Sequence, residues 1–92
     1  MPRILAFPAA EWVMREFEKL MVAIYEGTVR ANKLFVDDDD LRTSLSISNL
    51  AFSRLLREID GRKFLAEAFV QRQRLSTAGI EHVEERLLRR AA

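Results

Sequence analysis

Few side chains in this sequence have the types and spacing that catalysis needs. The only histidine is His82, and Glu81, Glu84 and Glu85 lie close to it along the chain. A general base must face a substrate, usually in a pocket beside a nucleophile or a second titratable group. The segment around His82 instead has the pattern of a helix that is polar on this side, so we expect an exposed histidine. We predict that the protein is not an enzyme.

Four consecutive aspartates, Asp37, Asp38, Asp39 and Asp40, are the other candidate for site chemistry. A calcium-binding EF-hand loop alternates its ligands, has a glycine in mid-loop and ends in a glutamate, and this run has none of these features. Carboxylates at the start of a helix stabilise the positive end of its dipole and cap its N–H groups. We therefore predict that the run begins a helix and binds no metal.

The composition is typical of one folded domain, with 92 residues of which 49% are hydrophobic and 32% are charged. The chain has no cysteine and no glycine-rich phosphate loop, so we predict no cofactor and no small-molecule substrate. No apolar run approaches the roughly 18 residues that a membrane span needs. We predict a cytoplasmic protein without membrane contact, in which residues 1–7 form an N-terminal arm.

Apolar residues at helical spacing predict a first helix from about residue 9 to residue 26. Its buried stripe comprises Val13, Phe17, Leu20, Met21 and Ile24. Gly27 either ends this helix or is carried through it, and as a compromise we predict a short second helix over residues 28–35.

The middle of the chain predicts two helices joined by a tight turn. Residues 41–45 form the first helix, Ser46-Ile47 the turn, and Ser48 caps a second helix that reaches Ile59. Gly61 then ends this helix, because glycine suits the left-handed conformation after a helix.

Two further helices are predicted over residues 62–75 and 78–90 from the same apolar spacing. The sequence therefore predicts an all-α fold, a compact single-domain bundle of about five helices. It contains a helix-turn-helix-like unit over residues 41–76, and residues 77–92 hold the terminal helix.

The charge is distributed unevenly, although the net charge is only +1. Residues 1–40 carry five basic and eight acidic side chains, whereas residues 41–92 carry ten basic and six acidic ones. If one half of the chain contacts phosphate groups, we expect it to be the second half.

The helix predicted after Ser48 has side chains that can contact DNA. Asparagine hydrogen-bonds adenine and arginine hydrogen-bonds guanine in the major groove, while leucine can contact a thymine methyl group. Its predicted exposed face consists of Asn49, Leu50, Ser53, Arg54 and Arg57. Ser48 would cap this helix, and we expect Arg62 and Lys63 to contact phosphate.

The residues of this unit resemble the helix-turn-helix half of AraC-type transcription regulators. The resemblance rests on Leu45-Ser46-Ile47-Ser48, on the stretch from Phe52 to Leu56, and on Gly61, Phe64 and Arg72. It covers residues 41–76, one motif of that family's two, and Arg42 and Ser46 stand where the family has a small residue and a glycine. The resemblance implies a DNA-binding transcriptional regulator.

Two other interpretations of the same residues remain open. The protein can be a small protein-binding adaptor or inhibitor, of the kind that phages and plasmids encode against a host regulator or nuclease. Its contact residues would then be Asp37 to Asp40 together with a terminal-helix stripe of Ile80, Val83 and Leu87. Alternatively, residues 41–76 are only three consecutive core helices. We expect a DNA reader to be a homodimer, formed through the 9–26 helix or the terminal stripe, since one motif buries little surface.

Overall fold

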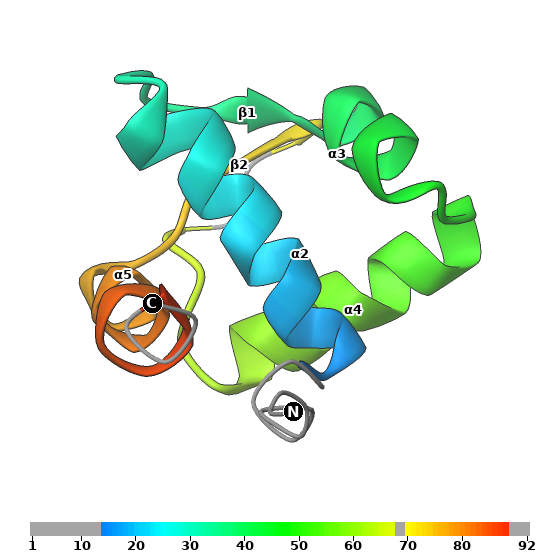
Figure 1. Cartoon of the computed structure of the whole chain (residues 1–92). Helices are drawn as coiled ribbons and strands as arrows, with labels where there is room; N and C mark the ends of the chain where they lie inside the picture. Colours follow the sequence, from blue (N-terminus) through cyan, green and yellow to red (C-terminus); the bar gives the residue numbers. More distant parts are fainter. Residues whose placement is uncertain (1–13, 68–69, 89–92) are drawn as a thin grey trace, which may run out of the picture.

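The structure is a computed structural model that describes residues 14–67 and 70–88. Within these ranges the chain is compact and mostly helical, with one small antiparallel sheet (Figure 1). The elements in chain order are α2 (Glu16–Tyr25), η1 (Glu26–Arg30), β1 (Val36–Asp37), α3 (Asp38–Leu45), α4 (Asn49–Gly61), β2 (Arg72–Gln73), α5 (Thr77–His82) and η2 (Val83–Leu88).

The first helix forms as the apolar spacing predicts, and the structure describes it from Glu16 onward. Its predicted beginning at residues 9–13 lies outside the described residues. The helix does not end at Gly27 but continues as the π-helical turn η1 to Arg30. A Cβ atom on Gly27 would lie 2.8 Å from Cγ2 of Val36, so glycine permits the close approach of this helix to β1. The predicted helix over 28–35 is wrong beyond Arg30, because Asn32 turns the chain with a φ of 57°.

The two helices predicted around the tight turn are present. α3 begins at Asp38, directly after Asp37, so the aspartate run does start a helix. Ser46 takes the left-handed conformation with a φ of 55°, and the hydroxyl of Ser48 accepts a hydrogen bond from the Ala51 N–H at 3.1 Å. This serine cap satisfies an N–H group that has no partner inside α4.

The end of α4 differs from the prediction at one residue. Gly61 is still helical, and the left-handed residue is Lys63, with a φ of 66°. The Phe64 N–H bonds to the Ile59 carbonyl at 3.1 Å, and the left-handed residue lies two positions later than expected.

The helix predicted over residues 62–75 is wrong. Leu65 pairs with Leu75 in an antiparallel bridge, and β2 pairs with β1, with Val36 opposite Gln73 and Asp37 opposite Arg72. The backbone of residues 72–75 is thus hydrogen-bonded on both sides, which fixes it in an extended form. Its side chains alternate, with Gln73 and Leu75 buried and Arg72 and Arg74 exposed. We call the described residues 64–67 and 70–75, joined by this antiparallel bridge, the wing; residues 68 and 69 lie outside the described residues.

The terminal helix forms as predicted, as α5 followed by the π-helical η2. The Ser76 hydroxyl caps it by accepting a hydrogen bond from the Gly79 N–H at 3.1 Å. Its predicted last residues, 89 and 90, lie outside the described residues.

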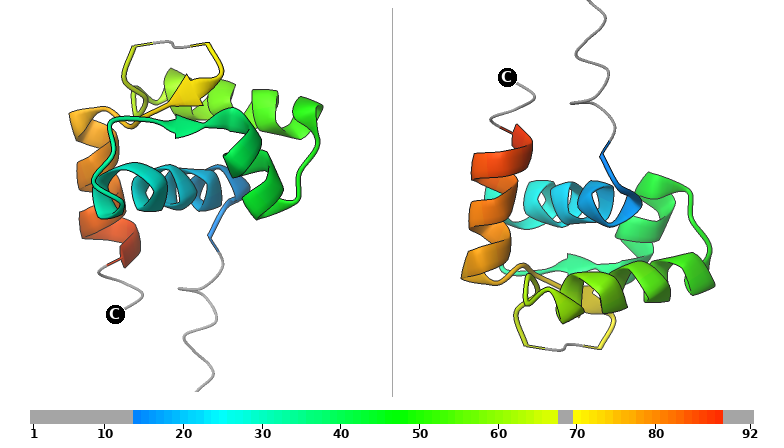
Figure 2. Two further views of the ribbon diagram at one scale, coloured as in Figure 1. Left: turned by 90° about the horizontal axis from the view of Figure 1, so that it is seen from above. Right: turned by 90° about the horizontal axis from the view of Figure 1, so that it is seen from below.

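α2 lies at the centre of the fold and packs against α3, α4 and η2. The core is formed by buried residues from all four helices and the wing, namely Phe17, Leu20, Met21, Ile24, Tyr25, Leu41, Phe52, Ile59, Leu75, Val83 and Leu87. Both views in Figure 2 show α4 and the wing on the same side of α2, with α5 and η2 at the opposite end of the molecule from α3. In the described part of the chain, no helix is long and apolar enough to cross a membrane.

Candidate nucleic-acid interface

One face of α4 is buried and the other is open to solvent. Phe52 and Ile59 are 4% and 0% exposed and pack in the core beside α2. The exposed residues recur at helical spacing and form one stripe, which we call the α4 stripe: Asn49, Leu50, Ser53, Arg54 and Arg57. The stripe contains all five residues that the sequence predicts on this face. Leu50 is unusually open for a leucine, at 66% exposure.

Arg54 and Arg57 lie one helical turn apart on this stripe. Among the described residues, neither has a hydrogen bond, an ion pair or a ring contact. All N–H donors of the two guanidinium groups are therefore available to an external partner. Such groups attract phosphate oxygens and can form bidentate hydrogen bonds with guanine.

Ser48 and Arg62, two other residues predicted at the interface, have partners inside the protein. Ser48 caps α4, as described above. Arg62 forms an ion pair with Glu58 at 3.2 Å, and its guanidinium lies 4.3 Å from the centre of the Phe17 ring. It therefore fastens the end of α4 to α2. Lys63, the next residue, is exposed and remains a candidate for phosphate contact.

Arg42 connects α3 to the beginning of α4, which the sequence does not predict. Its guanidinium donates hydrogen bonds to the carboxylate of Asp39 and to Oδ1 of Asn49, and lies 5.9 Å from the centre of the Phe52 ring. A small residue stands at this position in AraC-type regulators. Here a half-buried arginine bridges the two helices, so the oxygen of Asn49 is already engaged.

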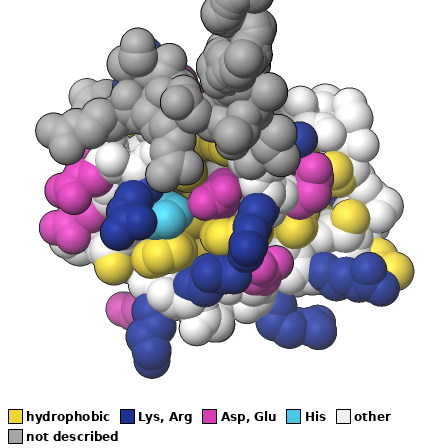
Figure 3. All heavy atoms as spheres, turned by 60° about the horizontal axis from the view of Figure 1, so that its bottom comes forward, with side chains coloured by type: hydrophobic (Ala, Val, Ile, Leu, Met, Phe, Trp, Pro, Cys, Tyr) yellow, Lys and Arg dark blue, Asp and Glu magenta, His cyan; other side chains and the backbone are white. Residues whose placement is uncertain are grey.

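His82 is half-buried, so the prediction of an exposed histidine is wrong. Its ring stacks on Phe64 with centroids 4.7 Å apart, and Nε2 lies 3.4 Å from the carboxylate of Glu18. The histidine is visible in Figure 3 among hydrophobic, basic and acidic side chains. Glu18 also accepts a hydrogen bond from the Arg15 N–H at 3.0 Å. The cluster joins α2, α5 and the base of the wing, and residues so far apart in the chain give no local signal of it.

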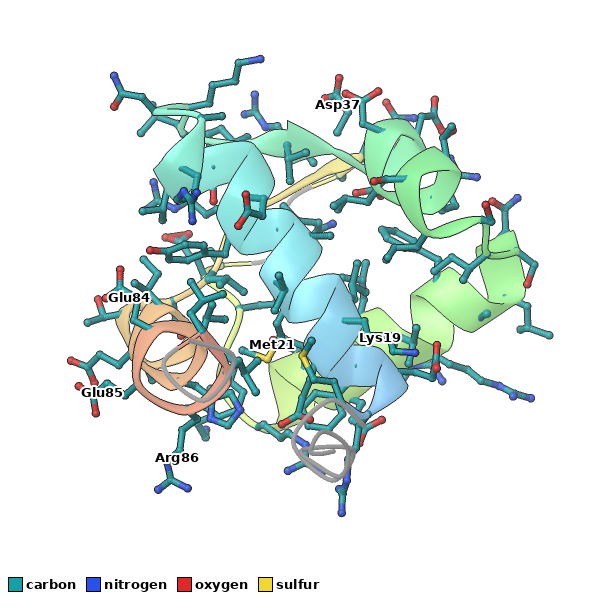
Figure 4. All side chains as sticks on the ribbon, viewed as in Figure 1. Lys19, Met21, Asp37, Glu84, Glu85 and Arg86 are labelled. Carbon is teal, nitrogen blue, oxygen red and sulfur yellow. The ribbon has the colours of Figure 1, made fainter. Side chains whose placement is uncertain are left out.

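Tyr25 forms a second contact between distant elements. It is 6% exposed, and its hydroxyl donates a hydrogen bond to the carboxylate of Glu84 at 2.7 Å. This bond and the burial of the ring raise the pKa of Tyr25 above its ordinary value of 10.0. Glu84 projects from η2 together with Glu85 and Arg86 on the outside of the helix (Figure 4).

The four aspartates divide into two pairs with different surroundings. Asp38 accepts a hydrogen bond from the buried side chain of Gln73 at 3.1 Å, and Asp39 is paired with Arg42. Asp37 and Asp40 are exposed and have no side-chain partner within residues 14–67 and 70–88. Asp37 points away from the body of the protein in Figure 4. Asp37 and Asp40 are therefore the two exposed aspartates of the run without an internal partner, whereas Asp39 is exposed but paired.

The terminal-helix stripe, predicted as a possible contact with a partner protein or a second copy, lies mostly inside the protein. Val83 and Leu87 are 0% and 7% exposed and pack in the core beside α2. Ile80 is half-buried and the only member that reaches the surface.

No protein-family model, curated protein or solved structure matches this chain. Among the described residues, no three histidine or carboxylate side chains lie together in a way that could hold a metal ion.

Proposed function

We propose that the protein is a non-enzymatic, cytoplasmic transcriptional regulator that binds double-stranded DNA through the α4 stripe. The observation that carries this proposal is the pair Arg54 and Arg57. Both arginines are exposed, lie one turn apart on a helix whose other face is buried, and have no partner in the described structure. A rigid helix that presents two unpaired arginines suits insertion into the major groove.

The arrangement of the neighbouring elements supports the same function. α3, the turn at Ser46 and α4 would form the helix-turn-helix, and the wing lies on the same side of α2 as α4 (Figure 2). A duplex held against α4 would therefore pass beside the wing, so the proposed unit is a winged helix-turn-helix. The resemblance to AraC-type regulators supports DNA reading by the unit of α3 and α4. The wing takes the place of the further helix that the sequence predicts over residues 62–75.

The side chains of the stripe have separate roles in this proposal. Arg54, Arg57 and Ser53 would contact base edges, and Leu50 a thymine methyl group. Asn49 would contribute its amide N–H groups, because its oxygen is bonded to Arg42. Lys63 would contact the phosphate backbone. We further propose that two copies bind two half-sites about 34–36 Å apart, since a single motif buries little surface.

An electrophoretic shift assay with pooled genomic fragments, at about 50 mM and about 200 mM salt, tests the DNA proposal. We expect binding at the lower salt concentration, a marked loss at the higher one, and a further loss in the double variant Arg54→Ala/Arg57→Ala. Arg30→Ala is the matched control, because Arg30 is an exposed arginine on η1 that is paired with Glu26 at 3.5 Å. No shift at the lower salt concentration would exclude the proposal. Sedimentation of the protein bound to its DNA fragment tests the dimer.

A second candidate is a protein-binding inhibitor that uses the acidic run. The exposed positions of Asp37 and Asp40 at the start of α3 favour it, because both carboxylates are open to a basic partner. The two functions respond in opposite ways to neutralisation of these aspartates.

A further inference from the structure

A groove of about 460 Å³ lies between the end of η1, the loop after it, the base of the wing and the beginning of α5. These elements are at the end of the molecule opposite α3 (Figures 1 and 2). The groove is lined by apolar, cationic and hydroxyl-bearing side chains. The apolar and cationic ones include Val29, Leu34, Leu75, Ile80, Lys33 and Arg74. It shares no residue with the α4 stripe.

Two apolar side chains of this groove are open to water. Leu34 is 70% exposed and Val29 is 41% exposed. An exposed apolar surface with a polar border is a common feature of protein-binding sites. Burying such side chains against another apolar group releases free energy in proportion to the area covered. The groove therefore favours an occupant with apolar side chains.

The charge at the groove specifies the occupant further. Among the described residues, its charged lining side chains are Lys33 and Arg74, both basic, and no carboxylate is among them. Both cations line the same groove as the exposed side chain of Leu34. An occupant that fits must therefore bring acidic groups next to its apolar ones.

We propose that this groove binds a segment of a partner protein in which acidic side chains alternate with leucine or similar apolar side chains. A nucleic-acid backbone offers anions but no aliphatic groups to cover Leu34.

The groove and the α4 stripe can be occupied at the same time, because they are formed by different residues. A protein bound to DNA through α4 would then hold a partner protein at the groove. The inference stands on the groove alone and does not require that the DNA proposal be correct.

Fluorescence anisotropy with a short fluorescein-labelled peptide of Asp, Glu, Leu and Phe tests the inference. We expect saturable binding in the micromolar range, and at least about tenfold weaker binding to the variants Leu34→Glu and Lys33→Glu/Arg74→Glu. Leu50→Glu is the matched control, since Leu50 is exposed to 66% but lies on α4, and this variant should bind the peptide normally. Circular dichroism establishes that each variant is folded.

Three results of the peptide assay would overturn the inference. They are no saturable binding, equal binding of a peptide with Lys in place of Asp and Glu, and unchanged binding by Leu34→Glu. Self-association of the protein that Leu34→Glu abolishes would also overturn it, because the groove would then belong to a second copy. The two proposals are distinguished by measuring both activities of each variant. Leu34→Glu should still shift DNA, and Arg54→Ala/Arg57→Ala should still bind the peptide.

Discussion

Gly79 packs so closely on Phe64 that a Cβ atom at position 79 would overlap the Phe64 carbonyl oxygen. That carbonyl accepts a hydrogen bond from the Ser76 N–H at 2.9 Å, and the Ser76 hydroxyl donates to the Lys63 carbonyl at 2.8 Å. The beginning of α5 is therefore fixed directly to the segment that follows α4. A substitution that displaces α5 at this junction would therefore also displace the wing relative to the α4 stripe.

Gly79→Ala should destabilise the protein by about 1–3 kcal/mol, because backbone atoms cannot move aside as a flexible side chain can. Gly61→Ala is the control, since a Cβ atom at Gly61 meets no atom within 4 Å. Gly61 is helical, so its replacement should stabilise the protein by up to about 1 kcal/mol. Urea unfolding of the two variants measures both effects. Equal effects of the two substitutions would show that the close contact at Gly79 is unimportant.

Ser76→Ala should cost more stability than Ser48→Ala. The Ser48 hydroxyl makes only a helix cap, and its loss costs about 0.5–2 kcal/mol. The Ser76 hydroxyl caps α5 and also bonds to the Lys63 carbonyl, so its loss should cost about 1 kcal/mol more. Thermal and urea unfolding of both variants gives the comparison. The reverse order of stability would contradict the junction described above.

The hydrogen bond from Tyr25 to Glu84 should make stability fall at alkaline pH. The pKa of Tyr25 is raised in the folded protein, so this contribution is complete below pH 10 and is lost as the pH rises through the folded pKa. Between neutral pH and a pH above 10, the free energy of unfolding should fall further for the unsubstituted protein than for the variant Tyr25→Phe.

The titration of this tyrosine can also be followed directly. Tyr25 is the only tyrosine in the chain, so the ultraviolet absorbance of the phenolate reports this one group. A midpoint at or below pH 10 in the folded protein would contradict the raised pKa. The unfolded protein in urea supplies the reference titration.

Neutralising Asp37 and Asp40 distinguishes the two candidate functions. Both carboxylates repel phosphate, so Asp37→Asn/Asp40→Asn should raise DNA affinity about twofold to tenfold at low salt and less at high salt. The shift assay described above measures this change, with Glu26→Gln on η1 as the control. A protein inhibitor would instead lose affinity for its basic partner. Weaker DNA binding by the double variant would contradict the proposed placement of the duplex.

The elements predicted correctly from sequence are those with local signals. Ser48 and Ser76 each cap the helix that follows, and a serine cap acts within three residues of itself. The stripe of α4 follows from the spacing of Phe52 and Ile59, because helical residues on one face must share one environment. Because Phe52 and Ile59 bury one face of α4, all five predicted stripe residues lie exposed on the other face.

The wing was not predictable from spacing, because Phe64, Leu65 and Leu75 have positions that suit a helix. The extended form of this segment depends on the pairing of Leu75 with Leu65 and of β2 with β1, and β1 is more than thirty positions earlier in the chain than β2. Backbone hydrogen bonds from so far away override the local preference. The same reasoning applies to Glu18 and His82, which meet only after α2 and α5 have packed.

The pairing of β1 with β2 means that the chain leaves and re-enters the body of the protein at one place. Asp37 and Arg72 are adjacent across the sheet, although α3, α4 and the outer part of the wing lie between them in sequence. A segment whose two ends already meet can be exchanged as a cassette without opening a gap in the backbone. Residues 38–71 also contribute Leu41, Phe52 and Ile59 to the core beside α2, so a replacement segment must supply equivalent apolar side chains. With those three positions kept, the exchange would alter the external surface while α2, α5 and η2 keep their mutual packing.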